Sequence, residues 1–351
     1  MPTSKLAIIR ADASTTIGIG HVMRMIALAQ ALIKSGWQVR LCYQYCPTKL
    51  VEQFEQIGAT THLLESDQCT GTALAQVAEA LDASLIVIDG YQFDDSFMES
   101  LCTSQIFTMM MDDYQHCQRY HARLIVNQNI GAKDYKYNCV NPDTRLLLGT
   151  EYVLLREEFR KNQIKPKVPG KEFKILITLG GADSENISAR LLSATRLALD
   201  TLVKTTNCLY QVRLVAGAAN PNKTSLTAQI ESYKSKHCDF AMLTDVSDMA
   251  TLIASSSLVI SAGGGTVWEA ACLAVPNMVV ILADNQRGIS KFADLGAIYN
   301  LGMAKDIEPS NVAGQIVDFV QSAQFLSMPK VAQTMVDGRG ATRIVQVIES
   351  I

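Results

Sequence analysis

One histidine of the sequence stands where it could act as a base. It lies in Gly18-Ile19-Gly20-His21, directly after a short apolar segment, and Arg10 and Arg24 flank it. Glycines let the backbone approach a ligand closely, and the helix predicted to follow places His21 near a positive dipole end that favours neutral imidazole. A neutral imidazole can take a proton from water, and the arginines indicate a phosphate or carboxylate ligand. A turn in which His21 merely caps or packs is the alternative.

Carboxylates follow two further apolar segments. Asp89-Gly90-Tyr91 comes directly after residues 85–88, and Asp112-Asp113 comes after residues 106–111. The carboxyl ends of parallel strands are common places for active-site residues. Aspartates are equally common as helix caps and turn residues. Taken alone, these carboxylates are therefore candidates for either role.

A glycine run in the second half could hold a pyrophosphate. Gly263-Gly264-Gly265 follows an apolar segment and precedes a predicted helix, where backbone amides and the helix dipole favour an anion. Glu269, about one turn further on, can accept a hydrogen bond from a ribose or sugar hydroxyl, or can be a surface carboxylate favoured by the dipole. Asn285-Gln286 offer amide groups to a sugar. The spacing is that of neither a P-loop nor a GxGxxG dinucleotide site.

The elements that must position these residues alternate along the chain. We predict helices at 21–35, 48–57, 186–199, 246–254 and 267–273, and strands at 6–10, 38–43, 85–89, 106–111, 124–126, 145–148, 174–178, 210–216, 242–243, 258–261 and 278–281. Strands that alternate with helices are typical of parallel sheets with right-handed crossovers. The predicted fold class is α/β, with two Rossmann-like doubly wound domains that face each other across a cleft, the GT-B architecture.

The domain boundaries follow from composition. A polar segment without apolar periodicity, which contains two prolines and a glycine, predicts a linker at residues 160–172. The first domain then covers residues 1–159 and the second covers 173–330. The remaining residues, 331–351, include a helix that we expect to pack back on the first domain.

Composition excludes several classes of protein. The 351 residues carry a formal net charge of −3 with lysine and arginine spread along the chain, so no basic face for nucleic acid is expected. Nine cysteines form no CxxC pair and no zinc-type cluster, which fits a reducing compartment. No apolar stretch approaches the ~20 residues of a membrane span, and the first apolar run is too short for a signal peptide. We expect a cytoplasmic protein without stable membrane insertion.

The motifs together resemble a known family. They are Arg10-x-Asp12, Gly18-x-Gly20-His21-x-x-Arg24, Asp89-x-Tyr91, Asp112-Asp113, Asn127-Gln-Asn129, Leu155–Phe159, Gly180-Gly181-x-Asp183, Ser261–Glu269 and Asn285-Gln286. In this order they resemble the UDP-sugar hydrolases of pseudaminic acid biosynthesis, which act on UDP-2,4-diacetamido-2,4,6-trideoxy-β-L-altropyranose. The resemblance runs from about residue 5 to residue 300. The end of the second domain is also similar to the lipid-linked N-acetylglucosaminyltransferase of peptidoglycan synthesis.

The resemblance implies a GT-B enzyme that binds a UDP-sugar mainly through UDP on the second domain. It implies hydrolysis with inversion at the anomeric carbon, without a metal or a cofactor, and with His21 as the catalytic residue. The implied substrate-binding residues are Arg10, Asp12, Gly20, Arg24, Asp89, Tyr91, Arg156, Gly181, Gly264, Thr266, Glu269, Asn285 and Gln286.

Two other functions fit the same residues. A glycosyltransferase would use a sugar or lipid acceptor in place of water, and a nucleotide-sugar sensor would bind UDP without catalysis. Function belongs to the site rather than to the fold. The stretch Tyr114–His121 is richer in polar and aromatic residues than the family pattern. These residues do not determine the identity of the sugar, the bond that breaks or the oligomeric state.

Overall fold

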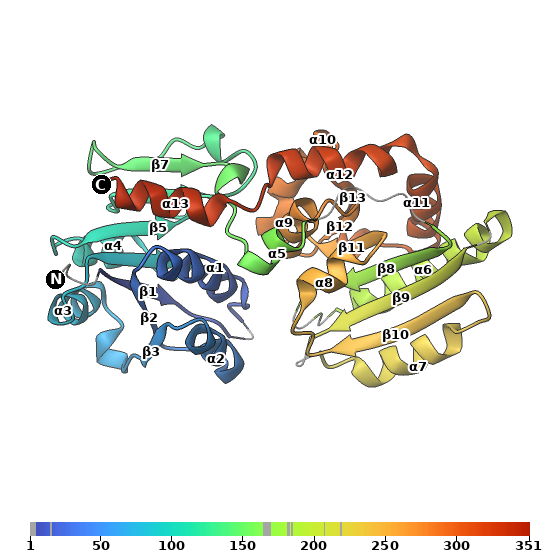
Figure 1. Ribbon diagram of the computed structural model, residues 1–351, viewed down its shortest axis with the longest axis horizontal. Coiled ribbons are helices and arrows are strands. Elements are labelled where there is room, and N and C mark those ends of the chain that lie inside the picture. The colour runs from blue at the N-terminus through green and yellow to red at the C-terminus, as the bar shows by residue number, and fades with distance from the viewer. Residues whose placement is uncertain are drawn as a thin grey trace. The chain divides into compact units, whose positions relative to one another are not determined.

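The computed structural model describes residues 5–14, 16–163, 170–180, 183, 185–206, 208–217 and 220–351, except the side chain of Asn285. The chain forms two compact units, one of residues 1–157 with 338–351 and one of residues 158–337. Each unit contains one parallel sheet with helices packed on it (Figure 1). The predicted class of two Rossmann-like α/β domains is confirmed. Residues 164–169 of the predicted linker lie outside the described residues.

The first unit is built on a parallel sheet of seven strands within the described residues, in the order β3-β2-β1-β4-β5-β6-β7. The strands are β1 (Leu6–Ala11), β2 (Gln38–Tyr43), β3 (Thr60–Leu63), β4 (Leu85–Asp89), β5 (Phe107–Met111), β6 (Leu124–Asn127) and β7 (Arg145–Leu148). The helices are α1 (Gly20–Lys34), α2 (Thr48–Gln56), α3 (Gly71–Ala80), α4 (Asp95–Leu101) and α13 (Gly340–Glu349), and α5 (Glu157–Lys161) begins where the unit ends.

Alternate residues of β1 belong to two different cores. Ala7 and Ile9 pack with residues of α1, α2 and α13 on one face of the sheet. Ile8 packs with residues of α3 and α4 on the other face. The strand order reverses beside β1, because the chain passes from β1 to β2 and β3 and then returns to β4. In such sheets the carboxyl ends of the strands at this switch point are the usual place for a ligand.

The second unit repeats the plan with six described strands in the order β10-β9-β8-β11-β12-β13. The strands are β8 (Glu172–Thr178), β9 (Leu209–Ala216), β10 (Cys238–Thr244), β11 (Leu258–Ala262), β12 (Asn277–Ile281) and β13 (Tyr299–Met303). The helices are α6 (Ile187–Thr205), α7 (Lys223–Tyr233), α8 (Met249–Ala254), α9 (Gly265–Cys272), α10 (Ser290–Asp294), α11 (Pro309–Gln321) and α12 (Ala323–Met335). Its strand order reverses between β8 and β11.

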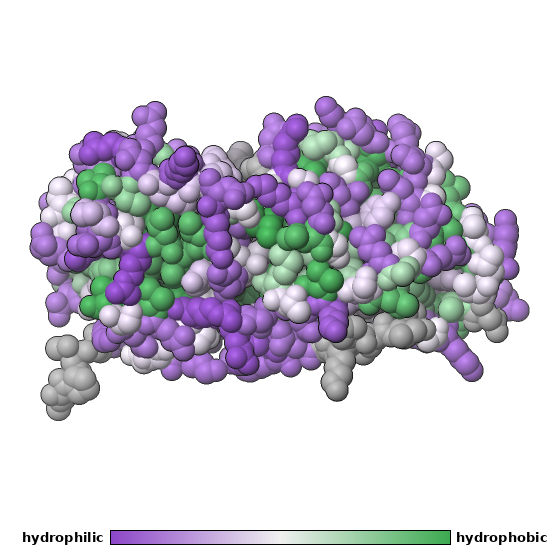
Figure 2. All heavy atoms as spheres, turned by 90° about the horizontal axis from the view of Figure 1, so that it is seen from above, coloured by the Kyte–Doolittle hydropathy of each residue, from purple (hydrophilic) through white to green (hydrophobic). Residues whose placement is uncertain are grey.

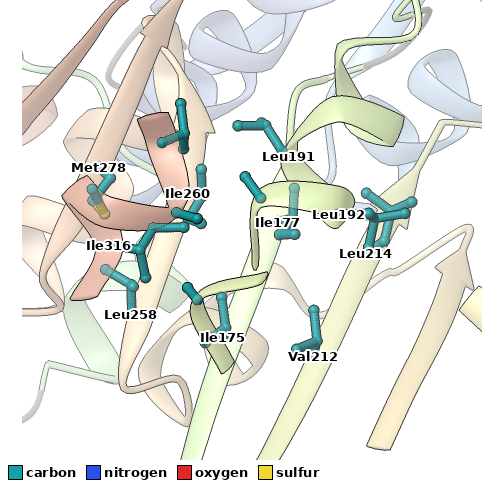
Figure 3. Packing of buried hydrophobic residues seen from close by; sticks show 14 of the residues in the cluster. Ile175, Ile177, Leu191, Leu192, Val212, Leu214, Leu258, Ile260, Met278 and Ile316 are labelled. Atoms are coloured by element: carbon teal, nitrogen blue, oxygen red, sulfur yellow. The ribbon is translucent and has the colours of Figure 1, made fainter. Parts of the chain in front are cut away.

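One face of the second sheet forms a large apolar core with α6 and α11. Figure 3 shows Ile177 of β8 and Leu214 of β9 close to Leu191 and Leu192 of α6, and Ile316 of α11 close to Leu258 and Ile260 of β11. These side chains are buried and aliphatic. The burial of such side chains fixes the position of β8 and β11, whose carboxyl ends carry the glycine loops.

The surface is mixed in character. On the side shown in Figure 2, polar side chains are interspersed with apolar ones, in line with the mean hydropathy of +0.12. None of the helices in the described part of the chain combines the length and the apolar character that a membrane crossing requires.

The last helix, α13, belongs to the first unit although the second unit precedes it in the chain. Its residues Ile344, Val345 and Ile348 are buried in the same core as α1, and Arg343 Nη1 donates to Glu151 O over 2.9 Å. At the start of α13, a Cβ on Gly340 would lie 2.2 Å from Val153 O. The helix can therefore approach this backbone only with glycine at that position.

We expect Gly340→Ala to destabilise the first unit by about 1–3 kcal/mol, the usual cost of overpacking. The matched control is Gly314→Ala in α11, where an added Cβ meets no atom within 4 Å. There alanine should stabilise the helix by about 0.5–1 kcal/mol. Thermal unfolding of both variants measures the difference. Equal effects of the two substitutions would contradict the close approach at Gly340.

Candidate active site

His21 and Asp89 meet where the strand order of the first sheet reverses. β1 and β4 are paired, with Ala11 opposite Asp89, and α1 begins soon after β1 so that His21 is its second residue. His21 Nδ1 lies 2.7 Å from Asp89 Oδ1. The Asp89 side chain is fully buried, and the His21 side chain is 8% exposed.

The short contact to Asp89 defines the tautomer of His21. A carboxylate oxygen only accepts hydrogen bonds, so Nδ1 must carry the proton that it donates over 2.7 Å. In the neutral ring the other nitrogen, Nε2, then has the free lone pair. The arrangement therefore holds an imidazole whose Nε2 can accept a proton, while Asp89 stabilises the imidazolium that results.

Arg24 bridges the fully buried carboxylate of Asp89 and the half-buried carboxylate of Asp113. Its Nε and Nη2 donate to the two oxygens of Asp89 over 2.6 Å each. Its Nη1 and Nη2 donate to the two oxygens of Asp113 over 2.8 and 3.0 Å. Arg24 lies one turn after His21 on α1, so the helix presents both side chains to Asp89. A planar guanidinium is the one side chain that can serve two carboxylates bidentately.

The charged groups of this cluster stabilise one another in their ionised forms. Burial alone would raise the pKa of Asp89, but Arg24 and then His21 lower it far below its usual range. Burial likewise opposes the charge of Arg24, but Asp113 and Asp89 raise its pKa above the usual value. The pKa of Asp113 is lowered, against the effect of burial, chiefly by Arg24. All three groups therefore stay ionised at neutral pH.

Tyr91 completes the site beside His21. Its ring packs edge-on against the imidazole, with centroids 4.7 Å apart, and its hydroxyl donates to Asp113 Oδ2 over 2.7 Å. Burial, followed by the charge of Asp113, raises the pKa of Tyr91, so the hydroxyl keeps its proton. Asn129 Nδ2 donates to Asp113 Oδ1 over 3.0 Å. Residues from the ends of β4, β5 and β6 thus share one hydrogen-bond network.

The neighbouring aspartate, Asp112, has a separate task. Its buried carboxylate accepts hydrogen bonds from Tyr137 Oη at 2.7 Å and from Asn127 Nδ2 at 3.2 Å. It also accepts from Tyr120 Oη and from the backbone of the following turn. His116 Nδ1 also lies 2.8 Å from Asp112 Oδ1. Burial alone would raise the pKa of Asp112, but the hydrogen bonds from His116, Tyr137 and the backbone lower it to about 2. Asp112 therefore organises the loop that carries Asp113.

The side chains of Arg10 and Asp12 are buried within the first unit. Arg10 is 2% exposed, its Nη1 lies 2.7 Å from Asp12 Oδ1, and its guanidinium lies over the ring of Phe93. Asp12 also accepts from the backbone of residues 44 and 45 and from Gln92 Nε2. Their contacts tie the loop after β2 and the loop after β4 to the end of β1. These two residues position the loops around His21.

The glycine loop of the second unit lies at the equivalent switch point. Gly263 follows β11, and a Cβ there would lie 3.1 Å from Cβ of Gln286. Gln286 Oε1 in turn accepts from the backbone N–H of Leu282, so Gln286 closes the loop after β12 against the glycines. Gly264 is the N-cap of α9 and has no side chain to bind the first amides of the helix. Those amides suit an anion.

The other predicted site residues have these positions. Gly20 begins α1, Thr266 and Glu269 are half-buried on α9, and Arg156 is half-buried directly before α5. Gly181 and the side chain of Asn285 lie outside the described residues. Within the described part of the chain, no cluster of three or more His, Cys, Asp or Glu side chains is arranged to hold a metal ion.

Some residues of the network were not predicted as site residues. The sequence leaves Asp113 open between an active-site role and a turn role, although it follows a predicted strand. Asn129 lies in a motif of the family resemblance, and its place after β6 is a signal that could assign it to the site. His116 and Tyr137 reach Asp112 from 4 and 25 positions away. Nothing in the sequence pattern indicates these two contacts.

Comparisons with known proteins agree with this architecture. Residues 174–344 match the model of the Glycosyltransferase family 28 C-terminal domain. The chain is 24% identical to the spore coat polysaccharide biosynthesis protein SpsG of Bacillus subtilis over 343 residues, 97% of each protein. It is also 24% identical to the UDP-2,4-diacetamido-2,4,6-trideoxy-beta-L-altropyranose hydrolase of Campylobacter jejuni, over 79% of this chain and 92% of that protein. The structure is also similar to the crystal structure of Acinetobacter baumannii MurG, with a TM-score of 0.66 and 17% identity. The similarity covers 99% of this chain and 100% of the MurG chain.

We expect Asp89→Asn to lower the free energy of unfolding by about 3–5 kcal/mol at pH 7, because it removes one partner of a buried ion pair. The pKa of Asp89 in the folded state lies below the value of about 4 expected in the unfolded chain. The stabilisation is therefore complete above pH 4 and is lost as the pH falls further. Chemical unfolding between pH 7 and pH 3 measures the difference between variant and wild type.

The control for this prediction is Asp67→Asn, which changes an exposed aspartate of the same unit. It should leave stability within about 0.5 kcal/mol of the wild type. A difference between Asp89→Asn and wild type that stays constant down to pH 3 would contradict the assignment of Asp89 as the charged partner.

Proposed function

We propose that the chain is a hydrolase that releases UDP from a UDP-linked 2,4-diacetamido-2,4,6-trideoxy sugar, with His21 as the general base. The observation that carries the proposal is the 2.7 Å contact from His21 Nδ1 to Asp89, which leaves Nε2 as a proton acceptor. Support also comes from the Campylobacter jejuni relative, whose name states this reaction, and from the family match over residues 174–344.

The reaction needs one proton acceptor and one stabilised leaving group. His21 Nε2 takes a proton from water while the water oxygen forms a bond to the anomeric carbon. The bond between that carbon and the diphosphate oxygen breaks, and its electron pair leaves with UDP, so the configuration inverts. Asp89 stabilises the imidazolium, and Arg24 keeps Asp89 ionised and oriented. Charge stabilisation of this kind is usually the largest part of catalysis.

The nucleotide is assigned to the second unit. The amides at the start of α9, around Gly264 and Thr266, can donate to the diphosphate, and the helix dipole stabilises its charge. Glu269 is the fifth residue of the same helix and can accept a hydrogen bond from a ribose hydroxyl. Gln286 borders the glycine loop. These groups favour departure of UDP without a cofactor.

A glycosyltransferase is the second candidate, because the matching family model is that of a glycosyltransferase domain. A base at His21 could take a proton from the hydroxyl of a sugar or lipid acceptor as readily as from water. The two functions differ only in the group that attacks. They are separated by whether UDP is released when no acceptor is present.

The decisive experiment incubates the protein with UDP-2,4-diacetamido-2,4,6-trideoxy-β-L-altropyranose in ¹⁸O-labelled water with EDTA and no acceptor. NMR follows UDP and the free sugar, and mass spectrometry locates the label. Equal release of both products with ¹⁸O in the sugar supports hydrolysis at the anomeric carbon. Label in UDP would show attack at phosphorus and would remove the proposed role of His21. Absence of release while UDP binds would favour the transferase.

We expect His21→Asn to lower turnover by roughly 100- to 10,000-fold, the usual effect of losing a general base. UDP affinity should stay unchanged because UDP is assigned to the second unit. The matched control is His237→Asn, which changes an exposed histidine and should keep wild-type turnover. Near-normal turnover in a folded His21→Asn protein would rule out the base.

We expect Glu269→Ala to weaken UDP binding about 10- to 150-fold, because the ligand loses one hydrogen bond to a charged acceptor. Calorimetric titration with UDP measures it. Asp318→Ala, on an exposed position of α11 in the same unit, is the control and should bind UDP normally. Unchanged UDP affinity in Glu269→Ala would show that the ribose lies elsewhere.

A further inference from the structure

Two tyrosine rings lie beside the proposed base and remain open to solvent. Tyr91 is 38% exposed and Tyr114 is 43% exposed. The ring centroid of Tyr91 is 4.7 Å from that of His21, and the Tyr114 centroid is 5.0 Å from that of Tyr91. The rings thus form a short row that leads outward from the imidazole. Exposed aromatic surface next to a catalytic group is typical of a ligand-binding wall.

The two rings differ in what their hydroxyl groups do. The Tyr91 hydroxyl is bound to Asp113 inside the charge cluster. The Tyr114 hydroxyl makes no hydrogen bond to any of the described residues, although the ring packs on Tyr91 and lies 5.9 Å from the ring of His116. Tyr114 takes no part in the network that orients His21. Its ring therefore serves a purpose other than positioning the base.

The backbone holds Tyr114 in place before any ligand arrives. Asp112 accepts from the N–H groups of Gln115 and His116 and from His116 Nδ1, at 2.9, 3.3 and 2.8 Å. Gln115 has a φ of 60°, so the chain turns sharply directly after Tyr114. A rigid aromatic side chain on a fixed turn loses little entropy when it contacts a ligand.

We infer that Tyr114 is a specificity-determining residue, whose ring packs against the apolar substituents of the sugar, namely a deoxy methyl group and an N-acetyl methyl group. The inference rests on the proposed function, because the anomeric carbon must lie next to His21 Nε2 and the sugar ring then extends along the tyrosines. Aromatic faces gain from burial against methyl groups and gain little against hydrated hydroxyl groups. Tyr114 thereby selects amino-deoxy sugars over hydroxyl-rich ones.

The test measures binding separately from hydrolysis. In a His21→Asn background, which prevents turnover, calorimetry compares UDP with UDP-2,4-diacetamido-2,4,6-trideoxy-β-L-altropyranose and with its analogue that bears a 6-hydroxyl group. Tyr114→Ala removes the ring, and Tyr114→Phe keeps the ring and removes the hydroxyl. With Tyr114 present, the sugar should add to the affinity of UDP, and the 6-deoxy ligand should bind about 10- to 100-fold more tightly than the 6-hydroxy analogue.

We expect Tyr114→Ala to reduce that preference to within a few-fold and to leave the affinity for UDP alone unchanged, while Tyr114→Phe keeps the preference. The inference is overturned if the preference survives in Tyr114→Ala or is absent with Tyr114 present. It is also overturned if Tyr114→Phe loses as much as Tyr114→Ala, since the hydroxyl would then be the recognising group. If the preference depends on Tyr114 but the wild-type protein does not hydrolyse the ligand, this inference is upheld and the proposed hydrolase is overturned.

Discussion

The architecture of the first site depends on the guanidinium of Arg24, whose side chain is 11% exposed. Two carboxylates, Asp89 and Asp113, lie at the ends of adjacent strands, and without Arg24 between them their repulsion and desolvation would be prohibitive. Two carboxylates and one guanidinium leave one net negative charge beside His21. In the proposed function, this net charge lies beside the ring that becomes positive when it accepts a proton from the attacking group. The ion cluster that holds the loops together therefore also serves the proposed base.

The adjacent residues Asp112 and Asp113 bind different partners, because successive side chains after a strand point in different directions. Asp113 joins Arg24 and Tyr91, while Asp112 joins Tyr137 and the turn that follows. The first sets the electrostatics of the site and the second sets the shape of its rim. The two carboxylates stay connected through Asn127 and Asn129. Asn127 Nδ2 donates to Asp112, the Asn129 N–H donates to Asn127 Oδ1, and Asn129 Nδ2 donates to Asp113.

The central strands could be predicted from the sequence because strands buried on both faces are nearly continuous apolar runs. The edge strands β3 and β13 could not be predicted, since they are short and half-exposed, with sequences such as Thr60-Thr61-His62-Leu63.

Much of the first site could be predicted from the sequence. The structure brings together four of the residues that the sequence indicates, namely His21, Arg24, Asp89 and Tyr91. The burial of Arg10 could not be predicted from its motif. The alternation along β1 directs it to the same face as Ile8, where it packs over Phe93.

The choice between water and another acceptor is not made by the base. A histidine oriented by Asp89 can deprotonate any hydroxyl that reaches its Nε2, so the chemistry of His21 is common to a hydrolase and a transferase. What differs is the surface next to the imidazole ring, where Tyr91 packs edge-on. Tyr91 is fixed there by Asp113, and Tyr114 is fixed by the turn that Asp112 holds. In the proposed function, an aromatic wall against the sugar orients its anomeric carbon toward His21, and a small nucleophile such as water then needs no binding site of its own.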